Sequence, residues 1–131
     1  MTRRCEVEKL ITLAEEIRDS PWADRLVHVL AMNDTIIRDP SLSDEEEVLD
    51  LIVNGGWVRE AALRHLLAEL TEAPVSVMYI HEDDTWFAAC ADPRKKFGDE
   101  ELESDVHGTE LEALKDLIDE VWRSIPREDR P

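Results

Sequence analysis

Histidine and carboxylate side chains gather in one short polar segment, His81-Glu82-Asp83-Asp84. Its oxygen-rich composition suits a hard cation, and His107 would join such a site if a strand brought it beside the segment. Four polar residues between two apolar runs are also what a solvated hairpin turn looks like. We favour the turn and expect no metal and no cofactor. A small metal-dependent enzyme built on this segment and His107 stays open as an alternative function.

The motifs that usually mark catalysis are missing from the sequence. No serine or cysteine has a base at a recognisable spacing, and Gly55-Gly56 lacks the strand-loop-helix pattern of a phosphate-binding loop. Cys5 and Cys90 lie far apart and form neither a CxxC pair nor a zinc motif, so we expect two thiols and no disulfide. The sequence therefore predicts a protein that is not an enzyme.

Negative charge is the strongest signal in the composition. The chain of 131 residues has 32 acidic and 15 basic residues, a net charge of −17. Such a surface repels nucleic acid and attracts basic partners. The acids concentrate in residues 39–50 and 97–112, which contain no lysine or arginine. The candidate partner-binding acids in these windows are Asp44, Glu45, Glu46, Glu47, Asp99, Glu100, Glu101, Glu103 and Asp105.

Two other causes of the acidic windows stay open. Carboxylates favour the first turn of a helix, where they complement the helix dipole, and both windows run into a predicted helix. Adaptation to high salt also enriches acids. The charge pattern alone does not separate these causes from the recognition of a basic partner.

Nothing in the sequence indicates a membrane. A membrane-spanning helix needs roughly 20 apolar residues, and no stretch of this chain approaches that length. Residues 1–6 turn acidic before the apolar part of a signal peptide could form. We therefore expect a cytoplasmic protein.

Apolar residues recur at helical spacing through the N-terminal half. The stripe from Val7 to Ile17 predicts a helix over about residues 4–18. Ser20 followed by Pro21 is typical of an N-cap and a first helical position, and predicts the start of a second helix.

Two more helices are expected before the chain changes character. Ser43 and Glu46 have the spacing of a capping box and predict the start of a third helix, and Asn54-Gly55-Gly56 predicts its end at a left-handed residue. A fourth apolar stripe follows and stops before Pro74. The N-terminal half should therefore contain about four helices.

After Pro74 the apolar period changes from that of a helix to that of a strand. Residues 75–80 and 85–91 are rich in β-formers and predict a hairpin, with a possible third strand over about 102–107. Trp86 and Phe87 point to opposite faces of this sheet, and Trp86 is a candidate anchor for a partner if its face is open.

A final amphipathic helix completes the predicted fold. Thr109 and Glu112 have the spacing of a second capping box, and the helix should end at Pro126. The expected architecture is α+β: a helical N-terminal half packed with a two- or three-stranded antiparallel sheet and a C-terminal helix. We expect one domain over residues 1–126 and a frayed tail over 127–131.

The C-terminal half also resembles a known family. Trp86-Phe87-Ala88-Ala89, then Gly108-Thr109 and Glu112-Ala113-Leu114, lie within residues 75–123, which resemble HicB-like antitoxin domains, where a similar hairpin leads to a TxxEAL helix. This resemblance implies a protein that neutralises a toxin. The size and acidity of the whole chain resemble those of phage-encoded inhibitors of the anti-CRISPR or DNA-mimic type.

These observations favour a non-enzymatic inhibitor that occupies the basic, nucleic-acid-binding surface of a partner protein. The alternative of the same class is an antitoxin or immunity protein that neutralises a toxin enzyme through the hairpin. In either case we expect no direct binding to nucleic acid or membrane, and a monomer or a homodimer.

Overall fold

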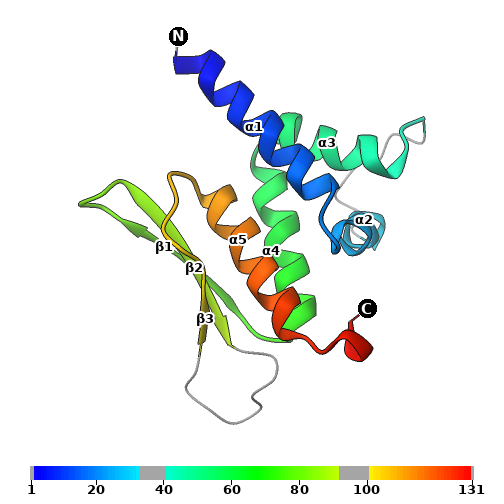
Figure 1. Ribbon diagram of the computed structural model, residues 1–131. Coiled ribbons are helices and arrows are strands. Elements are labelled where there is room, and N and C mark those ends of the chain that lie inside the picture. The colour runs from blue at the N-terminus through cyan, green and yellow to red at the C-terminus, as the bar shows by residue number, and fades with distance from the viewer. Residues whose placement is uncertain (1, 33–40, 92–100, 131) are drawn as a thin grey trace. The chain divides into compact units, whose positions relative to one another are not determined.

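Helices form the N-terminal half of the protein, and a helix covers three strands in the C-terminal half (Figure 1). The computed structural model describes residues 2–32, 41–91 and 101–130. In order, the elements are α1 (Thr2–Arg18), α2 (Ala23–Met32), α3 (Asp44–Asn54), α4 (Trp57–Thr71), β1 (Val75–Ile80), β2 (Thr85–Ala91), β3 (Glu101–Glu103), α5 (Glu110–Ser124) and a short 3-10 helix (Arg127–Asp129). This order confirms the predicted α+β class.

The chain forms two compact units, Met1–Ala62 and Leu63–Pro131. The single domain expected over residues 1–126 stays a prediction. No helix in the described ranges combines the length and apolar character needed to cross a membrane.

In the first unit, α1 and α2 both pack against α3. The apolar stripes predicted from the sequence supply the buried side chains of this unit. These include Ala14, Ile17, Trp22, Leu26, Val29, Leu30, Val48, Leu51 and Ile52.

Ser20 ends α1 instead of capping α2. Its hydroxyl donates a hydrogen bond of 2.6 Å to the carbonyl oxygen of Ile17, one of the carbonyls that the end of a helix leaves without a partner. Trp22 provides the first carbonyl acceptor of the second helix, so α2 begins at Ala23. The prediction that Ser20 is the N-cap of this helix is wrong, because its side chain serves the preceding helix.

The predicted limits of α3 are confirmed. The Glu46 amide donates to the Ser43 hydroxyl at 3.2 Å, and the Ser43 amide donates to the Glu46 carboxylate at 3.4 Å, which completes the capping box. After the helix, Gly56 has φ of +58°, the left-handed conformation expected for the glycine pair.

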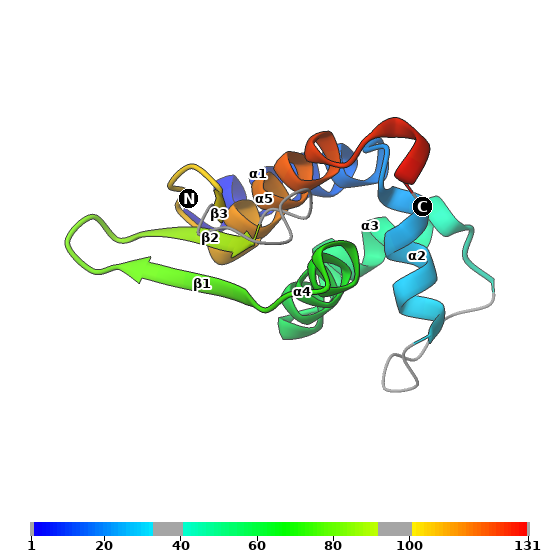
Figure 2. The same ribbon diagram turned by 90° about the horizontal axis from the view of Figure 1, so that it is seen from below.

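The second unit is built on a sheet with the strand order β1-β2-β3, all antiparallel. Ile80 pairs with Thr85, so four residues form the turn of the predicted hairpin, and the third strand is present as well. The strongly amphipathic α5 lies along one face of this sheet (Figure 2). Its buried residues are Leu111, Ala113, Leu114, Leu117, Ile118, Val121, Trp122 and Ser124.

The register determines which side chains of the sheet face α5. Cross-strand partners point to the same side, so Tyr79 and Trp86 share a face. His107 pairs with Trp86, and its imidazole contacts Asp116 of α5. The face that carries Tyr79 and Trp86 is therefore the α5 side, while Met78 lies on the opposite face.

The two ends of α5 are each fixed by a local contact. The Thr109 hydroxyl accepts a hydrogen bond from the Glu112 amide at 3.2 Å and donates one to the Glu112 carboxylate at 2.9 Å. In this second capping box, the two side chains are therefore hydrogen-bonded to each other. Within the tail predicted over 127–131, the residues Arg127–Asp129 form a 3-10 turn. The Arg130 guanidinium there lies 5.7 Å from the centre of the Trp122 ring.

Candidate partner-binding surfaces

A β-bulge follows β3. The Ser104 amide donates to the Ala88 carbonyl at 2.8 Å, and Trp86 and His107 exchange two hydrogen bonds of 2.7 and 2.8 Å. One residue separates Ala88 from Trp86, but two residues, 105–106, separate Ser104 from His107. Two residues of one strand therefore oppose one residue of β2, which is the definition of a bulge.

The Ser104 side chain supports this bulge from inside. Its hydroxyl accepts a hydrogen bond from the Ala88 amide at 2.9 Å and donates to the Asp105 carbonyl at 2.9 Å. The residue is only 8% exposed, so these bonds satisfy a polar group that would otherwise be costly to bury. The same bulge leaves Val106 57% exposed.

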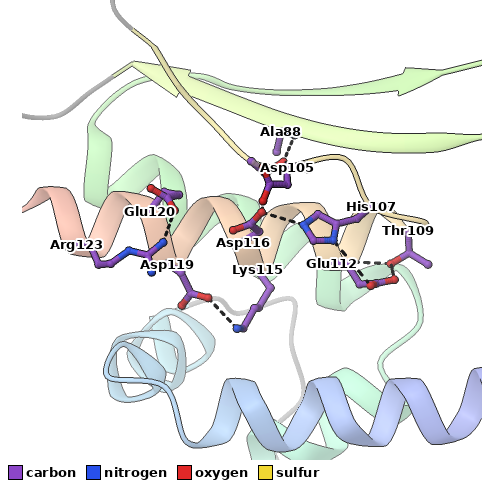
Figure 3. A network of polar contacts seen from close by, with 11 residues as sticks. Ala88, Asp105, His107, Thr109, Glu112, Lys115, Asp116, Asp119, Glu120 and Arg123 are labelled. Carbon is purple, nitrogen blue, oxygen red and sulfur yellow. Dashed lines mark hydrogen bonds and ion pairs between the residues drawn. The ribbon is translucent and has the colours of Figure 1, made fainter. Parts of the chain in front are cut away.

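Asp116 of α5 holds the bulge from the other side (Figure 3). One of its carboxylate oxygens, Oδ2, accepts a hydrogen bond from the Asp105 amide at 2.9 Å and lies 2.9 Å from Nε2 of His107. The other ring nitrogen, Nδ1, lies 4.0 Å from a carboxylate oxygen of Glu112. Carboxylates thus stand on both sides of the imidazole, an arrangement that positions the ring.

The acids of α5 lie next to cations of the same unit. Glu120 forms an ion pair with Arg123, and Asp119 pairs with Lys115 at 2.8 Å (Figure 3). At the start of the helix Glu110 pairs with Arg64. These carboxylates are therefore largely neutralised within the chain.

Glu101, Glu103 and Asp105, which we call the β3 acidic surface, are different. All three are exposed, and none forms an ion pair with a cation in the part of the chain that the structure describes. Glu101 and Glu103 pair with Ala91 and Ala89, which puts both side chains on the sheet face opposite α5. Asp99 and Glu100, predicted for the same surface, lie outside the described residues.

The other predicted acidic patch is the first turn of α3. Asp44, Glu45, Glu46 and Glu47 occupy this turn, where carboxylates complement the helix dipole. Glu46 also completes the capping box, and Glu47 is only 8% exposed. The remaining role of this turn in binding a partner stays a prediction.

The aromatic residues of the hairpin form a small cluster on the α5 side of the sheet. Trp86 is half-buried, and its ring lies 4.9 Å from that of Tyr79 between centroids, while Tyr79 and His81 are 6.1 Å apart. Tyr79 is 44% exposed, so it offers the more accessible ring of the pair. The Tyr79 hydroxyl donates to the Asp84 carboxylate, and this bond raises the pKa of Tyr79 above its usual value.

The structure does not assemble the metal site considered from the sequence. His81 contacts Tyr79 at the hairpin turn, whereas His107 faces Asp116 of α5. Within residues 2–32, 41–91 and 101–130, no three histidine, cysteine or acidic side chains gather closely enough to hold a metal ion.

Sequence reasoning missed Asp116 and Tyr79. Asp116 looks like one more charge on the solvated face of a helix, and nothing in its spacing indicates the Asp105 amide. The position of Tyr79, in contrast, could have been predicted from the sequence. A four-residue turn that pairs residue 80 with residue 85 also pairs Tyr79 with Trp86.

Comparison of the chain with protein-family models, with curated proteins and with solved structures gave no match.

Proposed function

We propose that this protein is a non-enzymatic acidic inhibitor that occupies the basic, nucleic-acid-binding surface of a partner protein, as phage-encoded anti-defence proteins of the DNA-mimic type do. One observation carries the proposal. The carboxylates of the β3 acidic surface are exposed and without cationic partners among the described residues, while Glu110, Asp119 and Glu120 of α5 are paired.

Unpaired carboxylates close together have an electrostatic cost that a basic partner removes. Glu101 and Glu103 are two residues apart on one strand, about 7 Å along its axis, and both lie on one face. Like charges at this spacing repel one another, and arginine or lysine side chains bound between them relieve the repulsion. A row of carboxylates on a rigid strand also resembles the regular negative charge of a nucleic acid backbone.

The first turn of α3, which also gathers acidic side chains, is the second proposed contact surface. Asp44 and Glu45 are exposed there. The negative charge of Glu45 also reaches Arg18 of α1: the pKa of Arg18 is raised mainly by its hydrogen bond to Asp19, with smaller contributions from the charges of Glu15 and Glu45. Because Glu46 completes the capping box and Glu47 is buried, we expect this turn to contribute less to binding than the β3 acidic surface.

A toxin-neutralising function through the hairpin is the second candidate, and it is favoured by a different observation. Met78 and Tyr79 of β1 are large apolar residues that are 40% and 44% exposed. An interface centred on them would be mainly apolar. Raising the ionic strength should weaken electrostatic binding steeply and leave such an apolar interface almost unchanged.

The experiment that tests the proposed function compares two triple variants that remove the same number of charges. One neutralises the β3 acidic surface with Glu101→Gln, Glu103→Gln and Asp105→Asn. The other neutralises paired acids of α5 with Glu110→Gln, Asp119→Asn and Glu120→Gln. We expect the first variant to lose affinity for a basic partner and the second to retain it. Equal affinity of the two variants would refute the assignment of the surface.

A further inference from the structure

β1 is an edge strand with an unoccupied side. It pairs with β2 on one side, and within the described residues no strand pairs with its other side. Its sequence, Val75 to Ile80, has no charged residue and no proline. In Figures 1 and 2 the hairpin extends beyond the N-terminal end of α5.

The register shows which backbone groups of β1 point outward. Trp86 exchanges both its backbone hydrogen bonds with His107, so its amide and carbonyl point toward β3. Tyr79, its partner on β1, therefore forms a pair without hydrogen bonds between the two strands. Since hydrogen-bonded and non-hydrogen-bonded pairs alternate, Val75, Val77 and Tyr79 all direct their amides and carbonyls to the open side.

The opposite edge of the sheet has the protection that β1 lacks. β3 is three residues long, has exposed glutamates at both its ends, and runs into the bulge at residues 105–106. Short length, charge and bulges are the devices by which natural sheets prevent pairing at an edge. Their presence on β3 and absence from β1 make β1 the edge at which another strand can add.

We infer that β1 binds an extended segment of a partner protein, which adds to the sheet as a fourth strand and has basic residues at both of its ends. The backbone groups of Val75, Val77 and Tyr79 would supply the hydrogen bonds. The requirement for basic ends comes from Glu72 before the strand and from Glu82 and Asp83 after it, all exposed. This last requirement rests on the proposed function, whereas the open edge does not.

A second copy of the chain fits this edge poorly. In a symmetric antiparallel pairing centred on Val77, the end of one copy that carries Glu72 would lie beside the end of the other that carries Glu82, because both residues are equally far from Val77 in sequence. The same pair of like charges would occur at the other end of the shared strand. Like charges brought close together repel one another, so a basic partner segment is favoured over self-association.

The test uses a labelled synthetic peptide of alternating valine and threonine with two lysines at each end, titrated with the full-length protein by fluorescence anisotropy. Val77→Pro removes an outward amide and keeps the inward bonds to β2, and Val77→Thr is the matched control that keeps the amide. We expect Val77→Pro to weaken peptide binding about tenfold or more, which is the effect of losing one or two hydrogen bonds, and Val77→Thr to bind like the natural protein.

Three controls keep the outcome interpretable. Near-ultraviolet circular dichroism reports whether Val77→Pro is folded. If it is not, the natural protein is titrated with the same peptide N-methylated along its central stretch, and affinity equal to that of the unmethylated peptide overturns the inference. A third peptide with glutamates in place of the lysines should bind at least about tenfold more weakly.

If folded Val77→Pro and Val77→Thr bind the peptide with equal affinity, the inference that a strand adds at β1 is overturned. The proposed role of the β3 acidic surface would be unaffected by that result. Loss of partner binding in the Glu101, Glu103 and Asp105 variant tests the proposed function separately, because that variant retains the β1 edge. Amide hydrogen exchange identifies the occupant: adding the peptide should slow the exchange of the backbone amide hydrogens of Val75, Val77 and Tyr79. If the exchange of these amides instead slows as the protein concentration rises, without any peptide, the occupant is a second copy of the chain. That result would overturn the assignment of a partner segment.

Discussion

The imidazole Nε2 of His107 lies 2.9 Å from Oδ2 of Asp116, and the same oxygen accepts the amide hydrogen of Asp105. This carboxylate therefore joins α5 to both ends of the bulge that follows β3. The bulge ends the regular pairing of β3 with β2, and the junction at Asp116 fixes the backbone of Asp105, one of the three residues of the β3 acidic surface.

Asp116→Ala should lower the free energy of unfolding by about 1 to 3 kcal/mol, because it leaves the Asp105 amide and the His107 ring without their acceptor. Urea denaturation measures the change. Glu120→Ala is the matched control one turn later on α5: its exposed pair with Arg123 should be worth about 0.5 kcal/mol or less. Equal losses in the two variants would show that Asp116 is only a surface charge.

Tyr79 is the single tyrosine of the chain, so the absorbance of tyrosinate reports its ionisation alone. The hydrogen bond to Asp84 raises the pKa of Tyr79, and the midpoint should lie above the usual value near 10. Asp84→Asn should lower the midpoint, since the phenolate would no longer face a carboxylate. Asparagine also tolerates the left-handed φ of +52° at this position.

Asp83→Asn is the control for this titration, because it removes a neighbouring exposed carboxylate that is not the acceptor of the Tyr79 hydroxyl. The sign of the linked stability follows from the raised pKa. The contribution of the Tyr79 hydroxyl is complete below pH 10 and is lost as the pH rises through the folded-state pKa. A midpoint that is the same in Asp84→Asn and Asp83→Asn would contradict the hydrogen bond.

Gly56→Ala should destabilise the protein by about 1 to 2 kcal/mol, because the residue has φ of +58° and alanine rarely adopts that conformation. No other atom lies within 4 Å of the added Cβ, so steric contact adds nothing to this cost. Gly56→Asn should cost less, since asparagine enters the left-handed region more readily. Thermal unfolding of the two variants measures the difference, and an Asn variant less stable than the Ala variant would contradict the assigned backbone.

Local signals account for what could be predicted from the sequence. The capping box of Ser43 and Glu46 and the hairpin turn of residues 81–84 depend on residues close in the chain, and both are confirmed. Ser20 shows the limit of such signals: its type and its place before Pro21 fit an N-cap, yet its hydroxyl closes the preceding helix.

The bulge and its support were beyond local reasoning. Asp116 and Asp105 are eleven residues apart, and their contact exists only after α5 has packed against the sheet. The acidic windows were visible in the sequence, but it could not show which acids have a cationic partner among the residues that the structure describes. Whether Glu110 has a cation depends on Arg64, which belongs to another helix.

The most direct test of the central claim is a competition assay in which the protein displaces labelled duplex DNA from a synthetic arginine-rich peptide. We predict that neutralising Glu101, Glu103 and Asp105 weakens displacement about tenfold relative to neutralising Glu110, Asp119 and Glu120, although each variant loses three negative charges. Raising the salt concentration should narrow this difference. Equal displacement by the two variants would show that net charge alone acts, and would contradict a role for the β3 acidic surface.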